Sequence, residues 1–191
     1  EMAEDLERIA MNFGGENIAA CIIEPIAGST GTLVPPKGYL KRIREICNKH
    51  GILLIFDEVI TGWGRTGSAF AAQEWKVTPD IMTMAKATTN GVVPMGVVAV
   101  KEEIYDSVLD ASSAPEGTPE LFHGYTYSGI PVAVAAALAV QDIFDKEDIF
   151  KRAKEMSPYL QDGLQSLKDL KEVVGIRGYG MMGGIEMRMK D

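Results

Sequence analysis

Two carboxylates, Asp57 and Glu58, follow the strongly apolar run ILLIF at residues 52–56. The carboxyl end of a parallel strand is where open α/β sheets place their ligands. An ionised Asp rarely lies there unless a cation or strong hydrogen-bond donors replace its lost hydration. Asp57 is therefore a candidate to bind a buried cation or a protonated heterocycle. The alternative is an Asp that caps the loop after the strand.

Lys86 is near the end of a second apolar segment, PDIMTMAKA, and precedes TTNGVVPMG, a loop that contains Gly and Pro. We expect an amine at the mouth of a sheet to lose hydration, which favours its neutral form and makes it a nucleophile toward a carbonyl. The alternative is a lysine whose aliphatic stem covers apolar surface while its ammonium stays in water.

Two hydroxyl side chains, Thr126 and Ser128, lie in HGYTYSGIP just before a predicted helix start. They are suited to helix capping and also to anion binding at a helix N-terminus. An Asp, a strand-end Lys and these hydroxyls together supply what pyridoxal 5'-phosphate requires. They offer one partner each for its pyridinium, its aldehyde and its phosphate. The predicted cofactor is therefore pyridoxal phosphate.

A competing hypothesis is a dinucleotide site. Gly62, Gly64 and Gly67 have the spacing of a pyrophosphate-binding fingerprint, and Asp80 lies at the distance expected of a ribose-binding acid. Such a fingerprint places its first Gly directly after the strand. Here residues 57–61 intervene, and two of them are acids that repel a pyrophosphate. We therefore interpret the glycines as parts of a tightly turned loop.

Apolar runs of strand length alternate with helical patterns along the chain. The predicted strands are residues 18–23, 52–56, 80–84 and 96–100. Hydrophobic runs with little polar alternation are typical of strands buried on both faces of a parallel sheet. A helical pattern between the first two strands, ending at Gly51, completes a βαβ unit. The predicted fold class is α/β, a mostly parallel sheet flanked by helices.

The second half of the chain is predicted to be mainly helical. Residues 110–120 are rich in Ser, Pro and Gly and indicate a loop, and one helix follows over residues 131–144. Another helix starts near Glu147, with an apolar stripe that we expect to pack inward. The strand-like segments 172–178 and 183–189 end the sequence, and we expect them to need strand partners from outside it.

Composition excludes several functional classes. The 191 residues are 46% hydrophobic and 24% charged, as in ordinary globular enzymes. A net charge of −8 without a basic cluster argues against nucleic acid, and no apolar run reaches the roughly 20 residues that cross a membrane. Cys21 and Cys47 lack the spacing of metal ligands or of a disulfide framework. We expect free thiols, no metal site and a cytoplasmic protein.

These motifs resemble the class III aminotransferases, pyridoxal-phosphate enzymes of fold type I. The matching segments, in the family's order, are IIEPIAGSTG, LLIFDEVITGWGRTG, PDIMTMAKATTNGVVPMG and HGYTYSGIPVAVAAALA. The likeness is greatest to the branch of ω-amino acid:pyruvate and β-alanine:pyruvate transaminases. The resemblance implies a transaminase that moves an amino group from an amine or ω-amino acid to a 2-oxo acid, with pyruvate as the expected acceptor.

The resemblance also implies roles for individual residues. Lys86 would form the covalent link to the cofactor aldehyde and later move a proton of the substrate. Asp57 would pair with the pyridine nitrogen, Val59 would cover one ring face, and Glu24 would support the ring's surroundings. Thr126 would bind the phosphate of the cofactor in a neighbouring subunit, because the family's active sites lie at the interface of a homodimer.

Two residues depart from many relatives that use glutamate or 2-oxoglutarate, which carry Glu in place of Ser29 and Gln in place of Ile60. The family chain is longer, so the resemblance makes this a fragment. It assigns residues 1–170 to part of the large cofactor-binding domain and residues 171–191 to the start of the small C-terminal domain.

Two alternative functions remain open. One is a transaminase linked to 4-aminobutyrate or glutamate, or an aminomutase, within the same family. The other is a non-catalytic chain that keeps the scaffold as an interaction module. The presence of both Asp57 and Lys86 argues against a non-catalytic module, because a scaffold alone needs no amine at the end of a strand.

Overall fold

The computed structural model describes residues 2–111 and 123–189, which form an α/β fold around a four-stranded sheet. The strand order is β1-β2-β3-β4. The strands are β1 (Ala20–Ile23), β2 (Leu53–Asp57), β3 (Ile81–Met84) and β4 (Val97–Val100). The first three run parallel and β4 pairs with β3 antiparallel. This confirms the fold class and the four predicted strands, but the expected burial on both faces is wrong for β1 and β4, where Ile22 and Val98 are exposed.

Helix α2 (Tyr39–His50) is the crossover between β1 and β2. It begins after Gly38 and ends at His50. Gly51, with a φ of 68°, has the left-handed conformation that terminates a helix, and its N–H donates to the Cys47 carbonyl. Its apolar face forms the core together with β2 and α1 (Glu4–Phe13). The buried residues of that face are Leu40, Ile43, Ile46 and Cys47. The predicted βαβ unit is therefore present.

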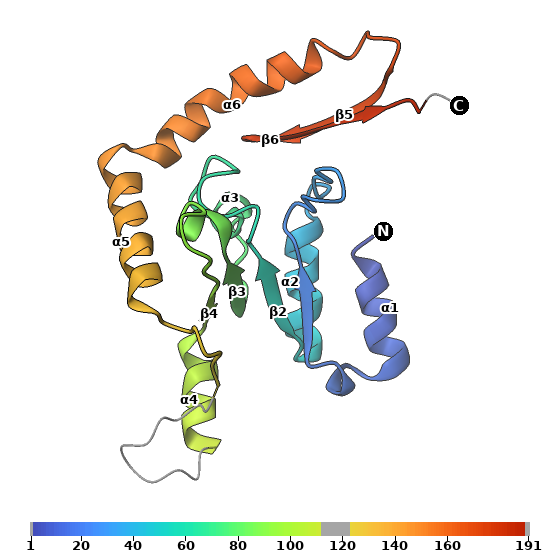
Figure 1. Cartoon of the computed structure of the whole chain (residues 1–191). Helices are drawn as coiled ribbons and strands as arrows, with labels where there is room; N and C mark the ends of the chain where they lie inside the picture. The colour runs from blue at the N-terminus through green and yellow to red at the C-terminus, as the bar shows by residue number, and fades with distance from the viewer. Residues whose placement is uncertain (1, 112–122, 190–191) are drawn as a thin grey trace.

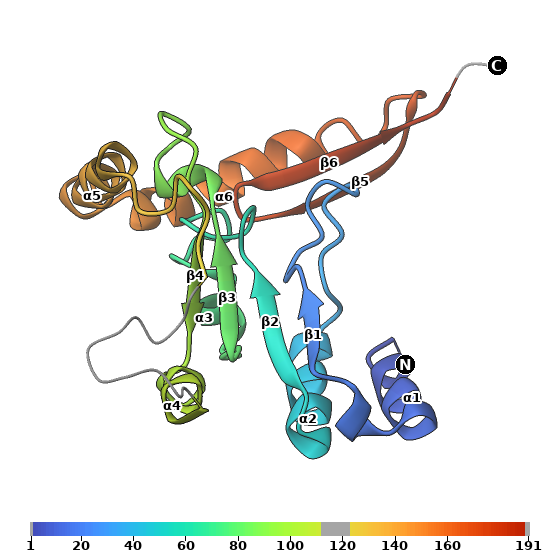
Figure 2. The same ribbon diagram turned by 60° about the horizontal axis from the view of Figure 1, so that its bottom comes forward.

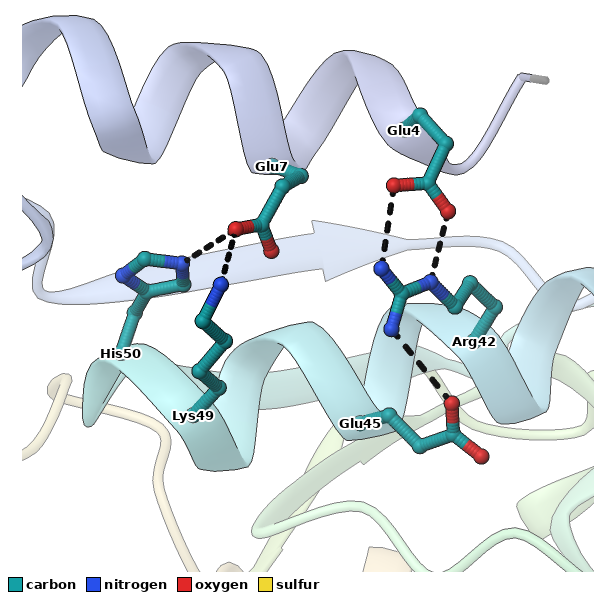
Figure 3. Close-up of polar contacts among 6 residues, drawn as sticks. All are labelled: Glu4, Glu7, Arg42, Glu45, Lys49 and His50. Carbon is teal, nitrogen blue, oxygen red and sulfur yellow. Dashed lines mark hydrogen bonds and ion pairs between the residues drawn. The ribbon is translucent and has the colours of Figure 1, made fainter.

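Charged side chains join α1 to α2 along the outer side of this core (Figure 3). Arg42 donates to both carboxylate oxygens of Glu4, at 2.6 and 3.0 Å. One helical turn further along α1, Glu7 accepts from Lys49 and contacts His50 Nε2 at 3.1 Å. His50, the last residue of α2, thus ties two helices together near the amino ends of the strands, away from the carboxyl edge of the sheet.

Three further helices follow the sheet strands. They are α4 (Glu102–Ala111), α5 (Pro131–Lys146) and α6 (Ile149–Gln165). Most of the predicted loop at residues 110–120 lies outside the described residues. Helix α5 agrees with its prediction, and the inward packing expected for α6 is found in part, because its apolar stripe is half-buried except at one residue. No residue of α6 is fully buried, and Met156 of its stripe is exposed, because α6 lies against α5 and a hairpin at the edge of the fold (Figure 1).

The last two strands form a hairpin, β5 (Val173–Tyr179) and β6 (Met182–Met187). They pair with each other in antiparallel register, with Tyr179 opposite Met182 and a turn at Gly180 that has a φ of 59°. The expectation that these segments need strand partners from outside the sequence is therefore wrong. The tight turn places the two strands side by side, so that each forms backbone hydrogen bonds with the other.

The hairpin lies beyond the carboxyl ends of β1 and β2, which both point toward it (Figure 2). Arg177 Nε donates to the Gly31 carbonyl at 2.8 Å, and the Met181 N–H donates to the Arg65 carbonyl at 2.8 Å. The hairpin is thus fixed to the loops after β1 and β2. Across residues 2–111 and 123–189, no helix has the length and apolarity to cross a membrane.

Candidate active site

Asp57 is the last residue of β2 and lies beside Thr83 of β3. It is half-buried, and its Oδ1 accepts a hydrogen bond from the Val59 N–H at 3.0 Å. No donor from the described residues reaches Oδ2. The predicted loop cap and the predicted functional carboxylate are therefore compatible, because capping uses one oxygen and leaves the other free.

Glu58 has a structural role that the sequence reading did not assign. Its side chain is fully buried and accepts from Thr61 Oγ1 at 2.7 Å and from the N–H groups of Ala71 and Ala72 at 2.9 and 2.8 Å. Burial raises the pKa of this carboxyl, and the three hydrogen bonds oppose the rise. The sequence contained one signal for the different roles of Asp57 and Glu58. Side chains alternate along a strand, so that two neighbouring residues point to opposite faces.

The anchored segment, α3 (Ala71–Trp75), begins where Glu58 binds it. The first N–H groups of a helix are the donors that a phosphate would use. In this chain the carboxylate of Glu58 already occupies two of them. No pyrophosphate can bind there without displacing it, which contradicts the dinucleotide hypothesis.

Asp80 contradicts that hypothesis as well. It lies at the amino end of β3, and it is bound by Arg44 at 2.6 Å, Lys101 at 2.7 Å and the Leu54 N–H at 2.7 Å. Burial raises its pKa, but the contacts to Lys101, Leu54 and Arg44 outweigh burial and hold the pKa below its usual value. Asp80 therefore joins α2, β2 and the start of α4, and it is not available to a ribose.

Lys86 follows β3 as the first residue of a short 3₁₀ turn, η2 (Lys86–Thr88). It is exposed and lines a cavity of about 640 Å³. The expected loss of hydration is therefore wrong for the described residues, because the side chain borders an open cavity and is not covered by apolar groups. Its place at the carboxyl edge of the sheet agrees with the prediction.

This cavity, which we call the lysine cavity, is formed by four segments. They are the loop after β1, the loop after β2, the turn that carries Lys86, and the hairpin turn. Its lining residues are Gly28, Ser29, Thr32, Val59, Ile60, Gly62, Arg65, Lys86, Ala87, Asn90, Gly91, Met181, Met182 and Gly183. Val59, Ser29 and Ile60 thus border the same space as the lysine, as their predicted roles require.

Arg65 also borders the lysine cavity. No acid within residues 2–111 and 123–189 forms an ion pair with it. The reason is the loop geometry. Gly64 and Gly67, with φ of 94° and 90°, turn the chain so that Arg65 is directed toward the cavity.

Glu24 follows β1 and is half-buried. Its Oε2 accepts a hydrogen bond from the Gly28 N–H at 2.9 Å, which stabilises the loop after β1. A Cβ at Gly28 would meet Ile60 Cδ1 at 2.7 Å, so the two loops pack closely there. Glu24 therefore supports the wall of the lysine cavity without lining it.

Thr126 is exposed in the turn before α5. Neither it nor Ser128 caps that helix, whose first turn has no side-chain cap. Ser128 Oγ accepts from the Tyr125 N–H at 2.8 Å. Tyr125 and Ser128 line a second, apolar cavity of about 680 Å³, which shares only Val59 with the lysine cavity. Thr126 lines neither of these two cavities.

Comparison with known proteins identifies the family. Residues 1–191 match the family described as aminotransferase class III. The chain belongs to the class III aminotransferase family. An omega-aminotransferase from Caulobacter vibrioides is 54% identical over 186 residues, which are 97% of this chain and 42% of that protein. An omega-amino acid:pyruvate aminotransferase from Pseudomonas putida is 48% identical over 190 residues, which are 100% of this chain and 42% of that protein.

The fold agrees with solved structures of class III aminotransferases. A thermostable (S)-enantioselective omega-transaminase from Thermomicrobium roseum aligns with a TM-score of 0.90 at 42% identity, over 97% of this chain and 40% of that one. The resemblance seen in the sequence motifs is therefore confirmed at the level of the family. The chain spans about two fifths of the length of these relatives.

The residues of this class III aminotransferase fit pyridoxal phosphate. Asp57 has a free carboxylate oxygen at a strand end, and Lys86 has an accessible amine on a cavity that Val59 also borders. These are an acceptor for a protonated ring nitrogen, a nucleophile for an aldehyde, and an apolar side chain for a ring face. The roles of Glu24 and Thr126 toward the cofactor stay predictions.

Proposed function

We propose that the protein containing this chain is a pyridoxal-phosphate-dependent transaminase. It moves an amino group from an amine or ω-amino acid to a 2-oxo acid, with pyruvate preferred. The observation that carries the proposal is the placement of Lys86 and Val59 on one cavity, with Val59 hydrogen-bonded through its N–H to Asp57 at the end of β2. Membership of the class III family supports the same reaction class.

The chain's own residues divide the work as follows. When bound, pyridoxal phosphate supplies an aldehyde and an electron-withdrawing ring. Asp57 would accept a hydrogen bond from the protonated ring nitrogen, and Val59 would cover one ring face. Lys86 Nζ would hold the cofactor at its aldehyde and would move a proton at the reacting carbon of the substrate.

Two lining residues support pyruvate as the acceptor. Ser29 and Ile60 bring neither a charge nor an amide to the lysine cavity. A five-carbon diacid such as 2-oxoglutarate needs contacts for two carboxylates, whereas pyruvate needs contacts for one. An uncharged wall at these positions suits the smaller acid.

We further propose that the enzyme is a homodimer with shared active sites. Thr126 is exposed and does not line the lysine cavity of its own chain. A hydroxyl so placed is free to reach a phosphate held by a second copy. The family resemblance supports this arrangement.

Borohydride reduction followed by peptide mass mapping tests the attachment site. The full-length enzyme, incubated with pyridoxal phosphate, is expected to carry the reduced adduct on Lys86, and Lys86→Ala is expected to lose turnover. Lys101→Ala is the matched control, because Lys101 is bound to Asp80 away from the cavity. An adduct on another lysine would show that the site is wrongly assigned.

A further inference from the structure

The backbone of Lys86 has an unfavourable conformation. Its φ is 48°, in the left-handed region that glycine adopts easily and lysine does not. A residue in that region is strained, and it persists only where its surroundings enforce the conformation. The contacts that stabilise this turn therefore also determine the position of the Lys86 backbone, from which the side chain extends.

Thr88 supplies the nearest of these contacts. It is buried, and both its N–H and its Oγ1 donate to the Ala85 carbonyl at 3.0 Å. The indole Nε1–H of Trp63 donates to the same hydroxyl at 3.1 Å. Since Thr88 Oγ1 donates to one neighbour and accepts from another, its rotamer is fixed within the turn.

Trp63 is itself held in place by aromatic rings. Its indole packs against Phe70 with ring centroids 5.0 Å apart, and against Phe144 of α5 at 5.6 Å. The N–H that reaches Thr88 therefore comes from a side chain with little freedom to move. A chain of contacts runs from α5 and the loop after β2 to the turn that carries Lys86.

We propose that Trp63 and Thr88 are positioning residues for Lys86. Their hydrogen bond, which we call the Trp63–Thr88 clamp, keeps the turn at residues 85–89 in the conformation that aims the amine. The inference rests on the proposed function, because it concerns the reach of Lys86 toward cofactor and substrate. A shift of the Lys86 backbone would displace the amine. Such a displacement slows a reaction step that needs aligned atoms more than it weakens substrate binding.

Three substitutions separate the clamp from general packing. Trp63→Phe keeps an aromatic ring between Phe70 and Phe144 but removes the donor. Thr88→Val keeps the β-branched shape but removes the hydroxyl, and Thr88→Ser keeps the hydroxyl. The matched controls are Trp75→Phe and Thr66→Val, because Thr66 Oγ1 is buried without a hydrogen-bond partner.

The full-length enzyme is measured in two forms. In the loaded enzyme we expect Trp63→Phe and Thr88→Val to lower kcat about tenfold, the effect of one lost hydrogen bond, with KM changed less than about twofold. Thr88→Ser and both controls are expected to stay near the unmodified enzyme. The double variant is expected to be no slower than the slower single variant, because both changes remove the same contact.

In the cofactor-free form, amide hydrogen exchange of residues 85–92 is followed by mass spectrometry. Trp63→Phe and Thr88→Val are expected to speed it about tenfold, while the control variants leave it unchanged. This measurement needs no cofactor, so it tests the clamp even if the borohydride adduct is not found on Lys86. If the adduct is missing from Lys86 but hydrogen exchange is faster in the variants, the proposed function is refuted. The conclusion that the clamp stabilises the turn is then retained.

Three results would overturn the positioning role, two of them specific to the clamp. One is exchange at residues 85–92 that is the same in Trp63→Phe and Thr88→Val as in the controls. The other is a Thr88→Ser enzyme as slow as Thr88→Val, because the hydroxyl would then be irrelevant. An equal rise of KM and fall of kcat would also refute it and indicate a general loss of the cavity's shape.

Discussion

Asp57 and Glu58 are neighbours in the chain with opposite environments. Asp57 is half-buried and keeps Oδ2 free of described donors, whereas Glu58 is fully buried with both oxygens hydrogen-bonded. One carboxylate is therefore available for chemistry, and the other fixes the loop that carries Val59. The two roles rest on the alternation of side chains at the end of β2.

We expect Glu58→Gln to destabilise the protein. An amide offers one acceptor oxygen in place of two, so a buried N–H of Ala71 or Ala72 would face an NH₂ group. The expected loss in unfolding free energy is about 1 to 3 kcal/mol, measured by urea denaturation at pH 7. Glu155→Gln, at an exposed position of α6, is the control. Equal stability of the two variants would contradict the anchoring role.

The raised pKa of Glu58 also predicts a pH dependence. Its stabilising contribution is fully present below the unfolded pKa of about 4.3 and is lost as pH rises through the higher folded pKa. Above pH 4, the unfolding free energy of the unmodified protein therefore contains a decline that Glu58→Gln lacks. Denaturation curves from pH 4 to 8 check this, and parallel profiles for both proteins would rule it out.

The α1 to α2 ion pairs predict the opposite pH behaviour. The hydrogen bond from Lys49 and then that of His50 lower the pKa of Glu7, against the effect of burial. The stability that Glu7 contributes is present above pH 4.3 and is lost as pH falls through its lower folded pKa. Glu7→Gln is expected to speed hydrogen exchange in α1 at pH 7 but not at pH 3. Glu16→Gln, on an exposed side chain, should leave both rates unchanged.

Thiol reactivity is expected to differ between Cys21 and Cys47. A hydrogen bond from Cys47 lowers the pKa of the half-buried Cys21 to about 7, while that interaction and burial raise the pKa of Cys47. Iodoacetamide should modify Cys21 alone, at a rate that rises as pH passes 7, because the thiolate reacts. Cys47→Ala should slow this reaction at pH 7, and Cys47→Ser, which keeps a donor, should slow it less. Preferential labelling of Cys47 would disprove the assignment.

Subunit mixing tests the homodimer. Thr126→Val and Lys86→Ala chains are each expected to be impaired alone. In the mixed dimer, one site is impaired in both residues and the other has both residues intact, so activity should reappear. The measurement is transaminase activity after subunit exchange verified by native mass spectrometry. No recovery in proven mixed dimers would show that Thr126 does not serve the partner's site.

The acceptor is tested by kcat/KM for pyruvate and 2-oxoglutarate with one amine donor. We expect pyruvate to be preferred, and we expect the combined Ser29→Glu and Ile60→Gln substitutions to reduce that preference. A tenfold preference of the unmodified enzyme for 2-oxoglutarate, about 1.4 kcal/mol of transition-state binding, would assign it to the glutamate-linked branch.

Local sequence determined the sheet and the positions of the two candidate site residues, Asp57 and Lys86, at the ends of its strands. Apolar runs of strand length identify β1 to β4 even though Ile22 and Val98 are exposed, and the polar residue that follows a run lies at the sheet edge. Asp57 and Lys86 could therefore be placed at the carboxyl edge without knowledge of any distant contact. Their identity as the chemical residues came from residue type and family resemblance.

Tertiary structure alone decided how these residues are supported. Trp63 meets Thr88 across 25 residues of sequence, Glu58 binds the N–H groups of α3, and Arg177 reaches Gly31 across 146 residues. No local pattern marks such pairs, because a buried polar group needs any partner of the right geometry, and only the folded chain determines which one is near. The exposure of Lys86 was likewise decided by tertiary structure. The apolar run of β3 indicates where the strand ends, but it does not indicate which residues cover the side chain that follows.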